Sequence, residues 1–186
     1  MAVPSKYIQS VVKAARGRPK STDWYREKIR EFGTPKALDL IRDGKQASRP
    51  FIGRLNMFFY DPKLKQKLPY YDRFPLVLPL ERYNDGFLGL NFHYLPIPLR
   101  MRLLDRVVDF SNNTKFDEST ILRVSYNQLK NVKLIKPTIK RYLAGKVKSR
   151  FRRVDADEFT IATLLPVARF KKGTVAQVHR DSRKML

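Results

Sequence analysis

The most strongly basic stretch of the chain runs from residue 130 to residue 153. It holds ten lysines and arginines and no acidic residue, and Tyr142 and Phe151 are interleaved with the cations. Cations at this density bind polyanions, because each neutralised phosphate of a nucleic acid releases counterions into the solvent. The alternative is a solvated face that only keeps the protein soluble, although soluble surfaces normally mix both signs of charge. We therefore predict that this basic segment contacts nucleic acid.

The spacing of these cations predicts how they are presented. From Lys146 to Arg152 charged and uncharged residues alternate, which favours a strand with cations about 6.5–7 Å apart on one face. Upstream, a helix opened by Pro137 would place Lys140 and Arg141 on one side. No recognition helix or zinc finger is indicated, so we expect contacts with the phosphate backbone of duplex DNA, without strong sequence preference. The predicted contacts from this segment are Lys140, Arg141, Lys146, Lys148, Arg150, Arg152 and Arg153.

A second group of cations lies near the N-terminus, at Arg16, Arg18 and Lys20. The sequence Arg-Gly-Arg-Pro at residues 16–19 is similar to the core of an AT-hook, which lays two arginines along the narrow minor groove of A·T-rich DNA. So short a match is weakly specific in a basic chain. The simpler interpretation makes Gly17 and Pro19 the end of a helix, beside incidental arginines. We predict that these three cations assist by touching phosphates.

Residue types suited to catalysis are few. The histidines, His93 and His179, are far apart in the sequence, and His93 follows a strand-like pattern in which a packed or hydrogen-bonded histidine is the common outcome. The chain has no HExxH, GxSxG or P-loop sequence and no cysteine. We predict a protein that is not an enzyme and has no cofactor or metal. The carboxylates weighed as ligands of a nuclease metal all lie near predicted turns or strand ends, where capping roles are ordinary: Asp61, Asp72, Glu81 and Asp85.

Composition bounds the class of protein. The 186 residues include 39 basic and 17 acidic ones, for a net charge of +22, and such a balance indicates a nucleic-acid partner. The charge is uneven, because residues 51–110 carry 9 basic and 6 acidic residues whereas residues 111–186 carry 18 and 6. No run approaches the roughly 18 apolar residues of a membrane span, so we expect no membrane contact.

The central stretch, residues 51–95, supplies the scaffold that must position these cations. Three apolar runs, Gly53–Tyr60, Phe74–Leu80 and Phe87–Tyr94, are separated by turn residues, and Asn84-Asp85-Gly86 is a strong hairpin signal. The prolines of the middle run cannot donate hydrogen bonds to a neighbouring strand, so we expect that strand at a sheet edge or at a bend. The predicted class is α+β, with a small curved antiparallel sheet or partly open barrel flanked by helices.

Helices are predicted on both sides of the sheet. Apolar spacing indicates helices before residue 50, and Pro96–Phe110 has the clearest stripe of a core-facing helix. We divide the chain into a basic helical N-terminal arm at residues 1–50, a central α+β domain at residues 51–166 and a C-terminal tail at residues 167–186. The central domain contains the basic segment 130–153.

Residues 51–142 carry a resemblance to a known family. The run LPYYDRFPLVLPLERYNDGFLGLNFHYLP, with IGRLNMFFYDPK before it and KFDESTILRVSYNQL after it, resembles the DNA end protectors, or head-completion proteins, of large contractile-tailed phages. The resemblance implies a virion protein, assembled in the host cytoplasm, that binds the end of the packaged genome, seals the filled head and shields the DNA end from exonucleases. It also implies portal, neck or baseplate proteins as partners.

Two other classes of protein share these features. A structural virion adaptor of the neck or baseplate would use the same positive charge to bind acidic partner proteins. A ribosome- or RNA-associated protein would direct its basic flanks at RNA. Binding to linear duplex, closed circle and RNA at several salt concentrations separates these classes, because only an end protector prefers linear DNA.

Overall fold

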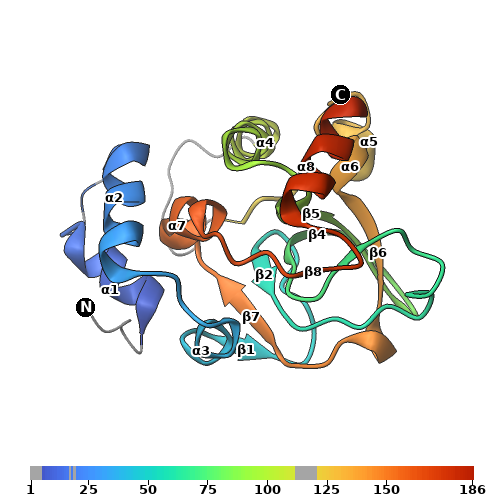
Figure 1. The fold of residues 1–186 in the computed structure, drawn as a ribbon, viewed down its shortest axis with the longest axis horizontal. Helices are drawn as coiled ribbons and strands as arrows, with labels where there is room; N and C mark the ends of the chain where they lie inside the picture. Colours follow the sequence, from blue (N-terminus) through green and yellow to red (C-terminus); the bar gives the residue numbers. More distant parts are fainter. Residues whose placement is uncertain (1–5, 17, 19, 112–120) are drawn as a thin grey trace.

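A computed structural model describes residues 6–186 of the chain, apart from residues 17, 19 and 112–120 (Figure 1). Within the described residues, three helices precede a run of five strands, helices and strands are mixed in the rest of the chain, and helices cover one side of the main sheet. The predicted α+β class with an antiparallel sheet flanked by helices is confirmed, and the sheet is not closed into a barrel. Within the described part of the chain, every helix is too short or too polar to span a bilayer.

The main sheet has six strands in the order β1-β7-β2-β4-β5-β6, and all neighbouring strands run antiparallel. A smaller sheet pairs β3 with β8, which come from distant parts of the sequence. The strands are β1 (Gln46–Ala47), β2 (Leu55–Met57), β3 (Tyr71–Asp72), β4 (Leu76–Tyr83), β5 (Gly86–Asn91), β6 (Ile139–Leu143), β7 (Phe151–Val154) and β8 (Phe170–Lys171).

The predicted hairpin is confirmed between β4 and β5, where Tyr83 pairs with Gly86 across the turn. The hairpin signal relies on the conformational freedom of glycine in a turn, but the structure requires Gly86 for a different reason. A Cβ at this position would lie 1.9 Å from the Tyr142 carbonyl oxygen of β6. The expectation of an edge position for the proline-containing strand is wrong, because β4 lies between β2 and β5. The sheet accommodates Pro79 by a register shift between Pro79 and Glu81. Such an irregularity bends a strand, so it corresponds to the other predicted outcome, a bend.

Helices form where the sequence supplies caps and apolar stripes. The Ser21 hydroxyl accepts a hydrogen bond from the Trp24 amide at the start of α2, and α4 begins after Pro96 as predicted. The α-helices are α1 (Tyr7–Ala14), α2 (Thr22–Phe32), α3 (Ala37–Arg42), α4 (Ile97–Phe110), α5 (Tyr126–Leu129), α6 (Ile135–Thr138), α7 (Phe159–Leu164) and α8 (Val175–Lys184). Short 3-10 turns are η1 (Phe92–Tyr94), η2 (Ala144–Lys146) and η3 (Ala156–Glu158).

The two faces of the main sheet are packed differently. Leu76, Leu78 and Leu80 of β4 belong to the large aliphatic core, to which α1, α2, α3, α4 and α7 also contribute. Burial of this apolar surface is the main stabilising contribution to the fold. The opposite face holds a small buried aromatic cluster, in which the rings of Phe58 and Phe151 lie 4.8 Å apart. Its buried members are Phe58, Tyr60, Val77, Phe87, Tyr142 and Phe151.

One predicted helix is a strand. Pro137 lies inside the four-residue helix α6, and the chain then extends into β6 along the free edge of β5. The prediction that Lys140 and Arg141 share one side of a helix is therefore wrong. Phe87 of β5 pairs with Tyr142 and their rings stack at 5.2 Å, so the cross-strand aromatic contact favours the strand.

Candidate nucleic-acid interface

The predicted row of cations from Lys146 to Arg152 does not form. Lys146 ends the turn η2, and β7 begins only at Phe151. The Arg152 side chain is fully buried, and its guanidinium pairs with the Glu158 carboxylate at 3.2 Å. The prediction that Arg152 belongs to an exposed face is wrong, because its guanidinium is buried in an ion pair with Glu158 of η3.

Arg153 is also engaged by an acid. Its Nε lies 2.5 Å from an Asp155 carboxylate oxygen, and the same carboxylate pairs with Arg54 at 2.8 Å and with Lys45 at 3.5 Å. The Arg153 guanidinium also lies 5.2 Å from the centre of the Phe51 ring. We call this group the acid-compensated cluster, and its members are Lys45, Arg54, Arg152, Arg153, Asp155 and Glu158.

Four chain segments that are distant in sequence lie side by side at residues 148, 59–60, 73 and 169, the first of which precedes the start of β7. The Lys148 amide donates to the Phe59 carbonyl at 2.7 Å, and the Tyr60 amide donates to the Arg73 carbonyl at 3.0 Å. The Arg73 amide in turn donates to the Arg169 carbonyl at 2.8 Å. These bonds place the segments at about the 4.8 Å spacing of neighbouring strands, so single cations from each segment become neighbours.

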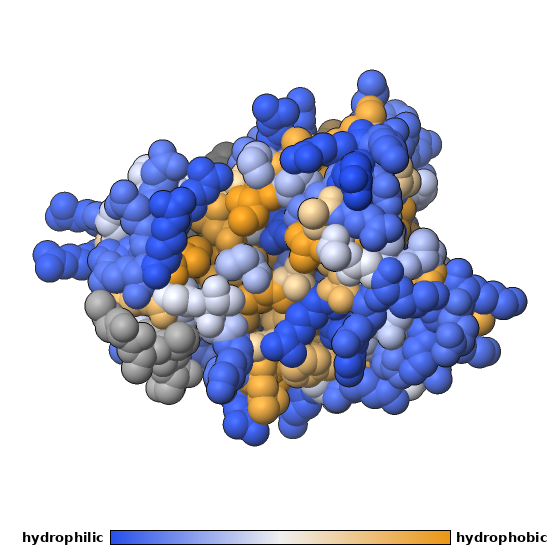
Figure 2. All heavy atoms as spheres, in the orientation of Figure 1, coloured by the Kyte–Doolittle hydropathy of each residue, from blue (hydrophilic) through white to orange (hydrophobic). Residues whose placement is uncertain are grey.

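We call the exposed residues Arg73, Lys148, Arg169 and Lys171 the cationic strip. None of the four forms an ion pair with a residue that the structure describes. Three of them, all but Lys148, border one hollow of about 450 Å³ beside the start of α8, and no described residue that lines it is acidic. Hydrophilic side chains dominate the right half of the molecular face in Figure 2. The strip is therefore a place where positive charge is free to meet an anion.

The strip helps to lower the pKa of a neighbouring acid, Asp61. The pKa of Asp61 is lowered, first by the hydrogen bond from Lys65 and also by the charges of Lys148 and Arg73. Arg150, a predicted contact, is exposed two residues beyond Lys148, and Lys146 is half-buried. Sequence reasoning missed Arg73, Arg169 and Lys171, because they stand far apart along the chain and no local spacing links them.

Lys140 and Arg141 lie at a second hollow, of about 380 Å³, beside β6. The Lys140 amine is held 4.1 Å from the centre of the Tyr94 ring, and burial lowers the pKa of Lys140 to about 8. The Arg141 guanidinium pairs with Asp85 and lies 4.1 Å from the centre of the Tyr83 ring. We call this the tyrosine hollow, since it is lined by Tyr60, Tyr70, Tyr71, Tyr94 and Tyr142.

A buried carboxylate forms part of that hollow. Asp72 accepts hydrogen bonds from His93 Nδ1 at 2.8 Å, the Asn91 amide nitrogen at 3.2 Å and the backbone amides of Phe74 and Arg169. Burial alone would raise the pKa of Asp72, but these donors hold it below its usual value. Burial lowers the pKa of His93, so this histidine is neutral. The predicted hydrogen-bonded role of His93 is confirmed.

The carboxylates weighed as a metal site do not converge. Asp61 pairs with Lys65, Asp72 contacts His93, Glu81 accepts from the Tyr83 hydroxyl, and Asp85 pairs with Arg141. Across the described residues, no group of three or more acids, histidines or cysteines is placed to hold a metal ion.

The N-terminal cations lie at the other end of the molecule. Arg16, Arg18 and Lys20 belong to the connection between α1 and α2, at the left of Figure 1, whereas β6 lies at the right. Arg16 ends α1 in the left-handed conformation, with φ 53°. The predicted helix-stopping roles of Gly17 and Pro19 fall outside the described residues.

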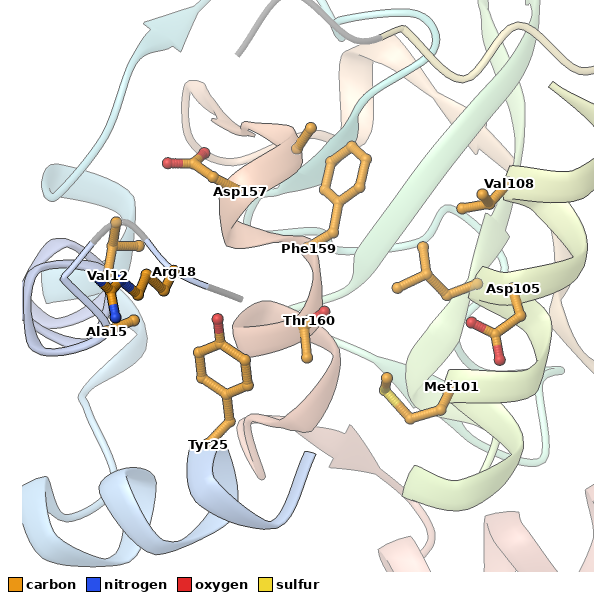
Figure 3. A pocket seen from close by; sticks show the side chains of 12 residues that line it. Val12, Ala15, Arg18, Tyr25, Met101, Asp105, Val108, Asp157, Phe159 and Thr160 are labelled. Carbon is orange, nitrogen blue, oxygen red and sulfur yellow. The ribbon is translucent and has the colours of Figure 1, made fainter. Parts of the chain in front are cut away.

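Arg18 borders a third hollow, of about 430 Å³, between α1 and α2 on one side and α4 and α7 on the other (Figure 3). Most of the side chains that line it are apolar, among them Val12, Met101 and Phe159, and two carboxylates, Asp105 and Asp157, also border it. The surroundings of Arg18 are thus unlike those of the cationic strip.

Comparisons with known proteins add one match. Residues 5–180 match the family model described as phage T4 terminal DNA protecting protein. The match includes both basic flanks as well as the sheet, and so extends beyond the central segment in which the sequence shows its resemblance. No curated protein and no solved structure matches the chain.

Proposed function

The chain belongs to the family of phage T4 terminal DNA protecting proteins, and we propose that it binds and shields the ends of packaged duplex DNA in the virion. The observation that carries the proposed mode of binding is the cationic strip, in which Arg73, Lys148, Arg169 and Lys171 are exposed without an acidic partner among the described residues. Side chains of this kind contact phosphates and make affinity fall with salt concentration.

The strip also explains why the proposed binding tolerates any sequence. Its cations come from a flat, sheet-like arrangement of four segments rather than from a helix that could enter the major groove. Phosphate contacts position a protein on the duplex without reading bases. Of the contacts predicted from sequence, Lys148 belongs to the strip, and Lys146 and Arg150 extend it. Arg152 is excluded by its burial.

Head completion is the second part of the proposal. A protein that seals a filled head must contact portal or neck proteins as well as DNA, and it would be assembled into the virion in the host cytoplasm. The hollow between α1 and α4 supports such a contact, because most of the described side chains that line it are apolar and none of them belongs to the strip. A purely structural neck or baseplate adaptor is the alternative function, and it would use that hollow without any DNA contact.

Electrophoretic mobility shifts on linear duplex, closed circular duplex and RNA of equal length test the proposal. We expect the tightest binding to linear DNA, and we expect the bound linear DNA to resist a double-strand exonuclease. Equal binding to all three would contradict end protection. No shift at physiological salt would favour the adaptor.

A further inference from the structure

The tyrosine hollow contains a cation that has no ion-pair partner among the described residues. The Lys140 amine lies over the Tyr94 ring, and it forms no ion pair or hydrogen bond with any residue that the structure describes. The Lys140 side chain is half-buried, and this burial lowers its pKa to about 8 because partial desolvation disfavours the charged amine. A negatively charged group that enters the hollow would pair with the Lys140 amine and stabilise its charged form.

The other walls of the hollow fit a flat aromatic ligand. The rings of Tyr70 and Tyr71 are half-buried at its edge, and Pro137 and Ile139 add apolar surface. Bases of every identity stack on aromatic side chains, because each has a π face. The volume, about 380 Å³, lies within the range of roughly 300–1,000 Å³ typical of small-ligand sites.

The acid in the hollow does not oppose an anion strongly. Asp72 already accepts four hydrogen bonds, from two side chains and two backbone amides. Hydrogen bonds to a carboxylate compensate its charge. The Asp72 charge is thus stabilised by four donors, whereas the Lys140 ammonium in the same hollow contacts only the Tyr94 ring among the described residues.

The position of the hollow relates it to the cationic strip. Tyr70, Tyr71 and Asp72 line the hollow, and Arg73, the next residue, belongs to the strip. Tyr71 also pairs with Lys171 between β3 and β8. The hollow and the strip therefore adjoin one another at β3 and Arg73.

We propose that the tyrosine hollow binds the terminal nucleotide of a DNA strand, with a phosphate at Lys140 and the base against Tyr70 and Tyr71. A nucleotide inside a duplex would first have to break its base pair and its stacking, which is unfavourable, whereas an end frays readily. The hollow thus supplies what a phosphate-binding surface alone lacks, namely a preference for ends. This inference rests on the proposed function.

The test compares a linear duplex with the same duplex closed at both ends by hairpin loops. The wild-type protein should bind the open duplex at least tenfold more tightly. Lys140→Met removes the charge while keeping the length of the side chain, and it relieves a buried charge, so the fold is retained. We expect this variant to bind both duplexes equally, at the affinity of wild-type protein for the closed one. Lys133→Met, a matched change at an exposed cation of the same basic segment, should keep the preference.

Crosslinking locates the nucleotide directly. A 5-iodouracil at the strand terminus should crosslink to Tyr70 or Tyr71, and an interior 5-iodouracil should not. Preference retained by Lys140→Met, or a terminal crosslink elsewhere, would overturn the inference while leaving the proposed function standing. No binding to either duplex would overturn both.

Discussion

The cationic strip and the acid-compensated cluster are two basic regions of one protein with opposite properties. Lys148 and Arg152 are four residues apart in the sequence. The Lys148 side chain is exposed and has no ion-pair partner within the described residues, whereas Arg152 is buried against Glu158. The difference arises from η3 and its N-cap residue, because Asp155 at the cap and Glu158 within η3 pair with arginines of β7. Among the described residues Lys148 forms no ion pair, and Asp61, whose pKa it helps to lower, pairs with Lys65 instead.

The comparison separates two uses of a positive charge. In the acid-compensated cluster the charge joins elements to one another, and it stabilises the fold only while its partner is present. In the cationic strip the charge contributes little to the fold and is available to a ligand. Substitutions in the cluster should therefore change the free energy of unfolding, whereas substitutions in the strip should change the affinity for DNA.

The largest effect is expected from Arg152→Met. The substitution leaves the Glu158 carboxylate buried without its partner, which should cost about 3–5 kcal/mol in the free energy of unfolding. Chemical denaturation followed by circular dichroism measures this. The double variant R152M/E158M should recover most of the loss, because it removes both charges. A single variant as stable as the wild type would contradict the role of the pair.

The next effect is expected from the strip variant K148Q/R169Q/K171Q. Affinity for linear duplex should fall at least tenfold, and the slope of log affinity against log salt should become less steep by about 0.9 for each phosphate that is no longer neutralised. The free energy of unfolding should not change, since these side chains are exposed. The control R30Q/K36Q/R42Q neutralises three exposed cations on α2, α3 and their connection. Equal reductions in both variants would show that net charge, and not the strip, determines affinity.

Acid should destabilise the fold through His93. Burial lowers its pKa in the folded protein below the usual 6.5, so the unfolded chain binds the extra proton and stability falls as the pH drops through about 6.5. Asp72 contributes only nearer its own, much lower range. We expect a decrease of about 1 kcal/mol in the free energy of unfolding between pH 7 and about pH 5.5.

His93→Asn identifies the group responsible. Asparagine can still donate a hydrogen bond to Asp72, but it does not titrate, so the pH dependence of the free energy of unfolding should flatten in this range. His179, whose pKa burial also lowers, accounts for any remaining slope. An unchanged slope in the variant would refute the assignment to His93.

The smallest effect is expected at the N-terminal cations. R16Q/R18Q/K20Q should change affinity for linear duplex less than about twofold at physiological salt, because charges beyond about 8 Å from the DNA are screened. The same mobility-shift titration measures it. A tenfold weakening, particularly on A·T-rich duplex, would instead restore the AT-hook interpretation.

The sequence alone was sufficient for much of the scaffold. Local patterns predicted the α+β class, the hairpin at Asn84 and Asp85 and the helix after Pro96, since turn chemistry and apolar spacing act over a few residues. The resemblance to the family could also be recognised from the sequence of the central segment. The net charge, which can be counted from the sequence without a structure, indicated a polyanionic partner.

Only the tertiary structure decided which cations are available. Arg54, Arg100 and Arg152 are buried, and no pattern along the chain distinguishes them from exposed arginines. Arg73 and Arg169 become neighbours through a backbone hydrogen bond between segments almost a hundred residues apart. The physical reason is that a charge is neutralised or left free by whatever lies within a few ångströms of it, and long-range packing determines those neighbours.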